Sequence, residues 1–326
     1  MSMPEREREK PQISIIIPLY NKAPYIKRAL DSVFSQTVQD FEVIVVGGKS
    51  TDGGEDIVKS YLDSRIRLIQ ETGTGVSAAR NQGVSVAQSE LIAFLDADDE
   101  WLPHFLKTIL SLRERYPNAG MYGTAFIEDS AGVKVDKIYE PEKGIQLLES
   151  YFAAKMKFCN HCGGMLICTS GTVVNRERYL DVGGFPEWAK QSEDRALRGK
   201  IALISDVAYS PEISVIYYTE CLNNTKHIYE YLVDPFSEYI ESIPKETLES
   251  RSDYLDIIDF CEANQLGLIE RNLYDFPHCK LRMLRELSKI HLSHHKSAKY
   301  SYIIQCFISP RTYEKLIRPV RRICTR

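Results

Sequence analysis

Four short apolar runs, each followed by a segment with helical spacing, constrain the fold of this chain more than any other feature. The runs are mostly apolar, as strands buried inside a parallel sheet are; the first is nearly continuous in β-branched residues, and the fourth is apolar throughout. They are Ile13–Ile17, Phe41–Val46, Ile66–Ile69 and Leu91–Leu95. In the segments that follow, apolar residues recur every three or four positions, as on one face of a helix. This alternation predicts an α/β fold, with a mostly parallel sheet and helices on both of its faces.

Beyond Gly120 the periodicity is looser and predicts a mixture of short strands and helices. The expected elements are strands over 121–127, 133–139, 172–174 and parts of 207–218, and helices over 145–156, from Glu177 and from Ser192. After about residue 220 only helical patterns remain. The second half of the chain is therefore expected to be less regular than the first.

Three parts are expected along the chain. Residues 1–11 are charged and lack the apolar core of a secretory signal, so we expect a disordered lead-in. Residues 12–220 form the α/β domain, and residues 221–326 form a helical, basic region. A hydrophobic content of 44% and a charged content of 26% are ordinary for a soluble globular protein. No apolar stretch approaches the roughly 20 residues that a membrane span requires.

Eight cysteines in a chain of this length, without a secretory signal, indicate reduced thiols and a cytoplasmic location. Cys159 and Cys162, with His161 between them, resemble half of a zinc site. A zinc site needs a second ligand pair at suitable spacing, and none accompanies them. We therefore expect free cysteines.

Three carboxylates follow the fourth apolar run. Asp96, Asp98 and Asp99 would repel one another unless a positive group lay among them. In an open α/β sheet, ligands bind at the carboxyl ends of the strands. An Asp-x-Asp pair offers oxygen ligands that suit Mg²⁺ or Mn²⁺, which takes its other ligands from water and substrate phosphates. The pattern predicts a metal site for a phosphorylated or nucleotide-linked substrate, and its alternative is a solvated turn.

The end of the chain is strongly basic. Residues 280–326 contain 12 Lys and Arg against 2 Asp and Glu, so residues 1–279 carry −14 within an overall net charge of −4. Basic amphipathic segments bind anionic membrane surfaces, which predicts peripheral attachment to the inner face of the cytoplasmic membrane. The alternative is a helical lid with a solvated basic face. No nucleic-acid-binding motif accompanies the charge, so nucleic acid is not an expected partner.

Several strings of residues, in order across about residues 12–218, give the chain a family resemblance. They are Ile17–Asn21, Asp40–Val46, Ser50–Gly53, Gly75–Asn81, Phe94–Trp101, Gly183–Phe185 and Ser192–Asp194. Together they resemble the family 2 glycosyltransferases, which have the GT-A fold, a Rossmann-like sheet flanked by helices. The resemblance implies a nucleotide-sugar donor, inversion at the anomeric carbon, and an acceptor hydroxyl on a polysaccharide or lipid-linked glycan.

The resemblance also assigns roles at the donor. Asp98, with help from Asp96, would hold Mg²⁺ or Mn²⁺ against the donor diphosphate, and Asp96 would alternatively contact the ribose. Arg80 would face the diphosphate, its alternative being a surface helix arginine in a solvated pair.

The loop after the first strand would complete the donor site. Tyr20 would stack on the base, its alternative being a partly buried aromatic residue. Pro18 and Asn21 belong to the same donor-binding loop.

The resemblance places the catalytic base at Asp194. An inverting transfer needs one carboxylate to take the proton of the acceptor hydroxyl while the oxygen attacks from the face opposite the leaving group. Glu193 would hold a neighbouring hydroxyl of the nucleotide-sugar or order the loop. The alternative for this pair is helix capping, and both roles are compatible.

One departure from the family pattern concerns the nucleotide. Gly47 and Gly48 stand where the family has an acidic residue that commonly accepts a hydrogen bond from the uracil ring N–H. Loss of such a contact costs on the order of ten- to a hundredfold in affinity, which Lys49 would offset in part through the phosphates.

This departure leaves the donor nucleotide open and keeps a second hypothesis, an impaired GT-A protein that binds a glycan or a partner enzyme. The presence of Arg80, Asp96, Asp98 and Asp194 favours the enzyme. A nucleotidyltransferase is a third hypothesis, but it would need a Gly-rich, basic loop directly after the first strand, where this chain has Pro18–Asn21.

Overall fold

The computed structural model describes residues 10–141, 147–148, 150–162, 165–220 and 233–275, together with Leu284. The chain divides into two compact units, residues 1–225 and 226–326. Residues 1–9 of the expected lead-in, and the basic segment 280–326 apart from Leu284, lie outside the described residues.

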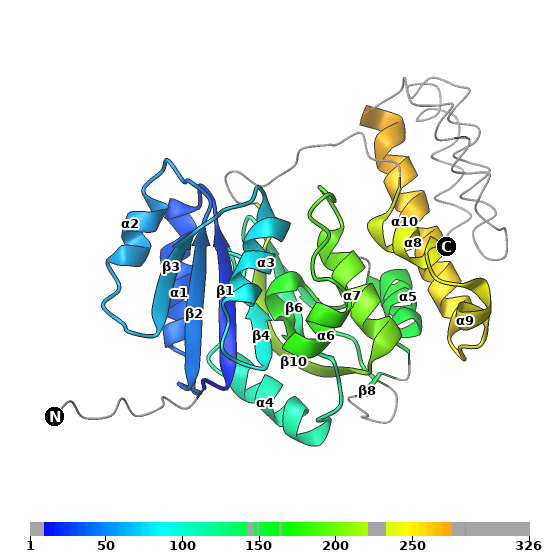
Figure 1. The fold of residues 1–326 in the computed structure, drawn as a ribbon, viewed down its shortest axis with the longest axis horizontal. Coiled ribbons are helices and arrows are strands. Elements are labelled where there is room, and N and C mark those ends of the chain that lie inside the picture. The colour runs from blue at the N-terminus through cyan, green and yellow to red at the C-terminus, as the bar shows by residue number, and fades with distance from the viewer. Residues whose placement is uncertain are drawn as a thin grey trace. The chain divides into compact units, whose positions relative to one another are not determined.

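A ten-stranded sheet forms the centre of the first unit (Figure 1). The strands are β1 (Ile13–Leu19), β2 (Phe41–Gly47), β3 (Ile66–Gln70), β4 (Leu91–Phe94), β5 (Glu100–Trp101), β6 (Met121–Ser130), β7 (Val133–Lys137), β8 (Leu147–Leu148), β9 (Thr172–Asn175) and β10 (Val207–Tyr218). Their order is β3-β2-β1-β4-β9-β6-β10-β5, with β7 beside β6 and β8 beside β10. The four apolar runs that the sequence singles out are therefore four neighbouring strands.

Strands β3, β2, β1 and β4 run parallel, with Ile15 of β1 opposite Val43 of β2 and Ala93 of β4. The expected parallel sheet is confirmed for these strands. From β9 onward the sheet is mixed, because β9 runs antiparallel to both β4 and β6, while β6 and β10 are parallel. Since parallel strands end at the same edge, the loops after β1, β2, β3 and β4 meet there.

Helices cover both faces of the sheet (Figure 1). In the first unit they are α1 (Ala23–Phe34), α2 (Gly54–Lys59), α3 (Val76–Ser85), α4 (Phe105–Arg115), α5 (Tyr151–Cys162), α6 (Arg176–Asp181) and α7 (Glu193–Ile204). Ile15 and Ile17 share one buried cluster with Leu30 of α1. Ile16 points to the other face, where a Cβ at Gly83 of α3 would lie 2.5 Å from its Cγ2. This alternation of side chains along β1 separates the two helical layers.

Some elements differ from the expected ones. The helix expected over 145–156 begins only at Tyr151, because Leu147 and Leu148 pair with β10 as β8. The two-residue strand β5 was also not expected; its Trp101 lies opposite Val215. Pairings this short leave no periodic signal in the sequence.

The described part of the second unit is helical, as the pattern after residue 220 predicts. It contains α8 (Pro235–Glu241), α9 (Lys245–Glu249) and α10 (Tyr254–Asp275). Asp234 caps α8 by accepting hydrogen bonds from the backbone N–H groups of Phe236 and Ser237, at 3.2 and 3.1 Å. The rings of Phe236 and Phe260 pack edge to face, 5.4 Å apart. None of the described helices combines the length and apolarity that a membrane crossing demands.

Candidate active site

The three aspartates lie where β4 ends, at the carboxyl edge of the sheet. Directly after β4, the backbone N–H of Leu95 donates to the carbonyl of Ile16, 3.1 Å away. The chain then turns, and the N–H of Asp99 donates to the carbonyl of Asp96 at 3.0 Å. Asp98 and Asp99 are only 9% and 1% exposed. The alternative of a solvated turn is therefore wrong for these two residues.

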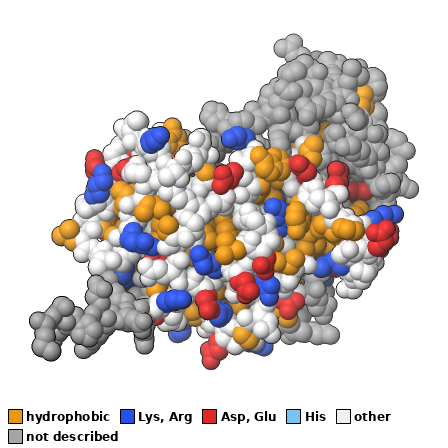
Figure 2. All heavy atoms as spheres, in the orientation of Figure 1, with side chains coloured by type: hydrophobic (Ala, Val, Ile, Leu, Met, Phe, Trp, Pro, Cys, Tyr) orange, Lys and Arg blue, Asp and Glu red, His pale blue; other side chains and the backbone are white. Residues whose placement is uncertain are grey.

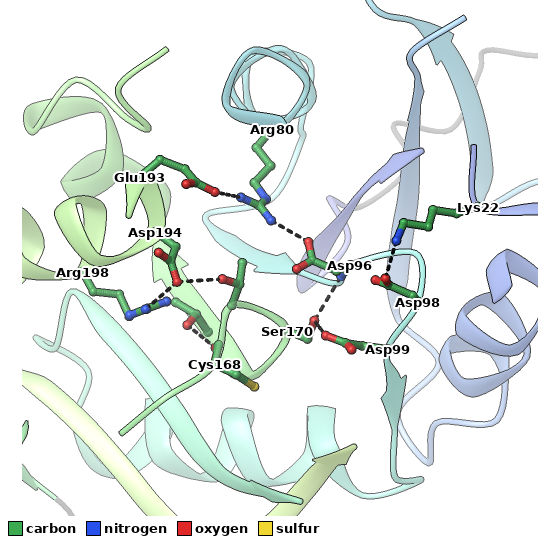
Figure 3. A network of polar contacts seen from close by, with 12 residues as sticks. Lys22, Arg80, Asp96, Asp98, Asp99, Cys168, Ser170, Glu193, Asp194 and Arg198 are labelled. Carbon is green, nitrogen blue, oxygen red and sulfur yellow. Dashed lines mark hydrogen bonds and ion pairs between the residues drawn. The ribbon is translucent and has the colours of Figure 1, made fainter. Parts of the chain in front are cut away.

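Two basic side chains neutralise this cluster, as the repulsion between its carboxylates requires (Figure 3). Lys22 Nζ lies 2.6 Å from Asp98 Oδ2, and Arg80 Nη2 lies 2.5 Å from Asp96 Oδ1. Lys22 is a site residue that the sequence analysis missed. A single lysine beside a loop and at the start of a helix carries no signal that separates it from a surface lysine.

Hydrogen bonds from two neighbouring residues hold the side chain of Asp99 in place. The hydroxyl of Ser170 donates to its Oδ2, and the backbone N–H of Tyr218 donates to its Oδ1 at 3.0 Å. Burial, together with the negative charges of Asp96 and Asp98, raises the pKa of Asp99 well above its usual value. Ser170 also accepts a hydrogen bond at 3.1 Å from the backbone N–H of Asp96, so it holds two points of the acidic turn.

Arg80 is a buried residue of α3, and its interpretation as a surface arginine is wrong. Its side chain is 4% exposed and bridges Asp96 and Glu193, with Nη1 3.2 Å from Glu193 Oε1. The guanidinium carbon also lies 5.0 Å from the centre of the Phe185 ring. Burial opposes the charge, but Asp96 and Glu193 outweigh it and raise the pKa of Arg80. Arg80 therefore connects the acidic turn to the start of α7.

The surroundings of Asp194 favour its ionised form. Burial would raise its pKa, but Arg198 and Arg195 outweigh that effect and hold the pKa of Asp194 below its usual value. Its Oδ2 lies 2.7 Å from Arg198 Nη2 and accepts a 3.3 Å hydrogen bond from Thr169 Oγ1. Its Oδ1 accepts a hydrogen bond from the N–H of Arg195 at 2.7 Å.

The pKa of the neighbouring carboxylate, Glu193, is shifted in the opposite direction. Burial and the charge of Asp194 raise the pKa of Glu193, although Arg80 opposes the shift. Two adjacent carboxylates whose environments push their pKa values apart are suited to different roles. Capping by Ser192 does not occur, since its side chain makes no cap hydrogen bond.

The loops after β1 and β2 are tied together. Asn21 Oδ1 accepts a hydrogen bond from the N–H of Thr51, and the N–H of Asn21 donates to Ser50 Oγ, both at 3.0 Å. Pro18 lies within β1, opposite Val46. Tyr20 is 62% exposed, so its interpretation as a partly buried aromatic residue is wrong.

Strained backbone gathers in the same region. Among the described non-glycine residues, Asn21, Lys49, Ala131 and Ser192 have positive φ angles, of 50°, 56°, 49° and 62°. Ala131 lies in the turn between β6 and β7. Asn21 lies in the loop after β1, Lys49 lies in the loop after β2, and Ser192 directly precedes α7. Such conformations cost about 1 kcal/mol or more each and concentrate at functional sites.

The described geometry therefore joins Asp96, Arg80, Glu193 and Asp194 in one chain of contacts, with Asp98 beside Lys22. Arg198 and Ser170, which the sequence analysis did not single out, complete it. These features define an open α/β protein, a class in which ligands bind at the carboxyl edge of the sheet. The sequence profile of glycosyl transferase family 2 matches residues 14–183, and the chain belongs to this family.

Relatives in sequence carry glycosyltransferase names. A stretch of 132 residues is 34% identical to the Escherichia coli UDP-Glc:alpha-D-GlcNAc-diphosphoundecaprenol beta-1,3-glucosyltransferase WfgD, covering 40% of this chain and 52% of WfgD. In four other curated relatives the match covers 30–45% of the relative's own length. The chain thus matches only part of these proteins.

Solved structures share the fold over nearly the whole chain. Residues 1–349 of Staphylococcus aureus TarS, in complex with UDP-GlcNAc, align with a TM-score of 0.71 and 16% identity, covering 95% of this chain and 92% of that one. The mannosyltransferase PcManGT of Pyrobaculum calidifontis, in complex with GDP-Man and Mn²⁺, aligns with a TM-score of 0.56 and 18% identity, covering 97% and 86%. The expected GT-A fold is confirmed.

Proposed function

We propose that this protein transfers a sugar from a nucleotide-sugar donor to a hydroxyl of a polysaccharide or lipid-linked glycan, with a divalent cation and with inversion. The observation that carries the proposal is the continuous set of contacts from Asp96 through Arg80 to Glu193, with Asp194 adjacent. It gathers an arginine, which suits phosphate, and carboxylates, which suit proton transfer, at one edge of the sheet. Family membership and the glycosyltransferase names of the relatives support the same activity.

The residues present fit a divalent cation. Asp98 binds a positive group, Lys22 Nζ, 2.6 Å from its Oδ2, and a cation bound there would replace this ammonium or share the carboxylate with it. A pair of carboxylates such as Asp96 and Asp98 suits Mg²⁺ or Mn²⁺, which binds through one or two carboxylates and completes its ligands from phosphates and water. Bound by Asp98 and Asp96, it would neutralise charge on the departing nucleotide.

Arg80 is suited to the donor diphosphate. Its Nη1 and Nη2 are engaged by carboxylates, whereas its Nε–H is buried and has no hydrogen-bond partner among the described residues. A buried donor left without a partner is costly, and a phosphate oxygen would satisfy it with a charge-assisted hydrogen bond. In this proposal Tyr20, exposed beside the same loops, stacks on the base, and Pro18 and Asn21 hold the loop that presents it.

Asp194 is proposed as the base. Its low pKa keeps it ionised and able to accept the proton of the acceptor hydroxyl, although Arg198 weakens its basicity. Glu193, held by Arg80, would bind a neighbouring hydroxyl. A single base opposite the leaving group corresponds to a one-step displacement with inversion.

The proposals for the acceptor and for the location of the protein rest on the name of a relative and on the sequence of the basic segment. The name of WfgD describes transfer to a sugar on diphosphoundecaprenol, and by analogy we propose a lipid-linked or polysaccharide acceptor. Peripheral attachment to the cytoplasmic membrane surface would rest on residues 280–326, which lie outside the described residues apart from Leu284. On the face shown in Figure 2, acidic and basic side chains of the described residues are interspersed. That face gives no support to a membrane-binding surface in the first unit.

The test is release of nucleotide from a panel of nucleotide-sugars, with and without Mn²⁺, by the wild type, Asp98→Ala and Asp194→Asn. We expect slow, Mn²⁺-dependent release from one donor, lost in Asp98→Ala. With an acceptor, Asp194→Asn should lose transfer by about 10²-fold or more while still binding the donor. If none of the nucleotides in the panel binds in a metal-dependent way, the proposal is contradicted. That result would favour a glycan-binding or partner-binding protein.

A further inference from the structure

A partly buried carboxylate with one shielded oxygen, outside the contacts described so far, points to a ligand. Glu71 follows β3 directly, and its backbone N–H continues the ladder by donating to the carbonyl of Gly47 at 2.8 Å. Its Oε1 is shielded from solvent and accepts no hydrogen bond from any described residue. Burial raises the pKa of Glu71, although a hydrogen bond from the N–H of Gly75 and the charge of Lys49 oppose the shift. A buried acceptor left unpaired is costly and needs an explanation.

The glycine pair after β2 makes room for this carboxylate. A Cβ at Gly48 would lie 2.7 Å from Glu71 Oε2 and 3.4 Å from the Cβ of Tyr20. A Cβ at Gly47 would instead meet Glu55, whose own Oε2 accepts a hydrogen bond from Gln70 at 2.8 Å. Successive side chains of a strand point to opposite faces, so Glu71 and Glu55 approach the pair from different sides. Only Glu71 shares its side with Tyr20.

These residues together form a surface for a flat ring that bears an N–H group. Tyr20 offers an exposed aromatic ring, Glu71 an unused acceptor, and Lys49 a positive charge near the carboxylate. The surface lies at the end of β2, two strands from the end of β4 in the order β2-β1-β4. Two strand spacings are about 10 Å. A ring bound here could thus be linked through a phosphate chain to the acidic turn after β4.

We propose that Glu71 recognises the base of the donor nucleotide by accepting a hydrogen bond from the ring N–H of a uracil-type pyrimidine. This inference rests on the proposed function, which supplies the nucleotide. One free oxygen matches one ring N–H. Cytosine and adenine carry an unprotonated ring nitrogen at that edge, which would face the carboxylate as a second acceptor. A turn of the carboxyl about its terminal bond, a soft torsion in glutamate, brings the free oxygen toward the ring.

The test is calorimetric binding of UDP, GDP, CDP and ADP in the presence of Mn²⁺. The wild type is expected to prefer UDP. Glu71→Gln should weaken UDP binding roughly ten- to a hundredfold, because the amide has a single acceptor oxygen, for which the N–H of Gly75 and the ring N–H compete. Binding of CDP should not weaken, because the amide NH₂ can donate to the unprotonated ring nitrogen, and this also reports that the variant is folded. Glu55→Gln is the matched control and should bind all four diphosphates as the wild type does.

A second variant moves the carboxylate instead of removing it. Gly48 does not have a positive φ, so a side chain is tolerated by its backbone. An aspartate at position 48 would direct its carboxylate into the place that Glu71 occupies. Gly48→Asp combined with Glu71→Ala should therefore recover the UDP preference that Glu71→Ala alone loses.

The outcomes separate this inference from the proposed function. If the wild type binds no nucleoside diphosphate, the proposed function fails and the inference with it. If it binds all four equally, prefers GDP, or keeps its UDP preference in Glu71→Gln, the role of Glu71 is wrong while a donor site remains.

Discussion

Lys22 occupies, next to Asp98, a place that a divalent cation would share. The two side chains are 14% and 12% exposed and 2.6 Å apart, so their attraction is only weakly screened by solvent. Binding of a cation to Asp98 must displace this ammonium or accept its repulsion. Lys22 is therefore expected to set the cation affinity of the site.

Replacement of Lys22 should tighten cation binding. Lys22→Met removes the competing charge, and we expect Mn²⁺ to bind about tenfold more tightly, measured by the loss of the free Mn²⁺ signal in electron paramagnetic resonance. Lys27→Met is the control, because Lys27 pairs with Asp31 at the surface of α1, where the side chains are 70% and 53% exposed. Equal Mn²⁺ affinity in Lys22→Met and the wild type would contradict the competition.

At the scale of elements, the packing of α3 on the sheet positions Arg80. Gly83 lies one turn further along α3 and allows the helix to approach β1 closely, since a Cβ there would lie 2.5 Å from Ile16 Cγ2 and 3.3 Å from Val46 Cγ2. Movement of this helix would shift Arg80 relative to Asp96.

The substitution Gly83→Ala should lower the free energy of unfolding by about 1–3 kcal/mol, because the added methyl overpacks the contact with the sheet. Gly267→Ala in α10 is the control. No atom lies within 4 Å of its added Cβ, and alanine favours the helix by roughly 0.5–1 kcal/mol. Urea unfolding of both variants checks the signs, and a stabilised Gly83→Ala would show that α3 is not closely packed.

The elements that sequence analysis predicted are those with a local pattern. The runs at β1, β2 and β4 are buried on both faces and read directly from composition, whereas β3 is only partly buried. The antiparallel insertion of β9 and the short β5 and β8 depend on pairing partners distant in sequence, and local periodicity does not contain that information.

The same limit applies to the site. Asp96, Asp98 and Asp194 stand in recognisable strings, whereas Lys22 meets Asp98 across 76 positions and Arg80 meets Glu193 across 113. The pKa values of Asp194 and Glu193 shift in opposite directions because of burial and of charged neighbours such as Arg198 and Arg80. A sequence pattern can name such residues but cannot show which charges face them.

At the scale of the whole molecule, we propose that donor chemistry belongs to the first unit, where one sheet edge gathers the ends of four parallel strands. In this proposal the edge binds a nucleoside diphosphate together with a divalent cation at Asp98. If the cation and the diphosphate contact each other in this site, each must change the binding affinity of the other by the same factor.

The most direct test is calorimetric titration of UDP into the wild type and Asp98→Ala, each with Mn²⁺ and with chelator. We expect Mn²⁺ to tighten binding to the wild type by at least about tenfold, and Asp98→Ala to abolish this gain while remaining folded by circular dichroism. Equal affinity with Mn²⁺ and with chelator, or an undiminished gain in Asp98→Ala, would contradict the proposed donor site.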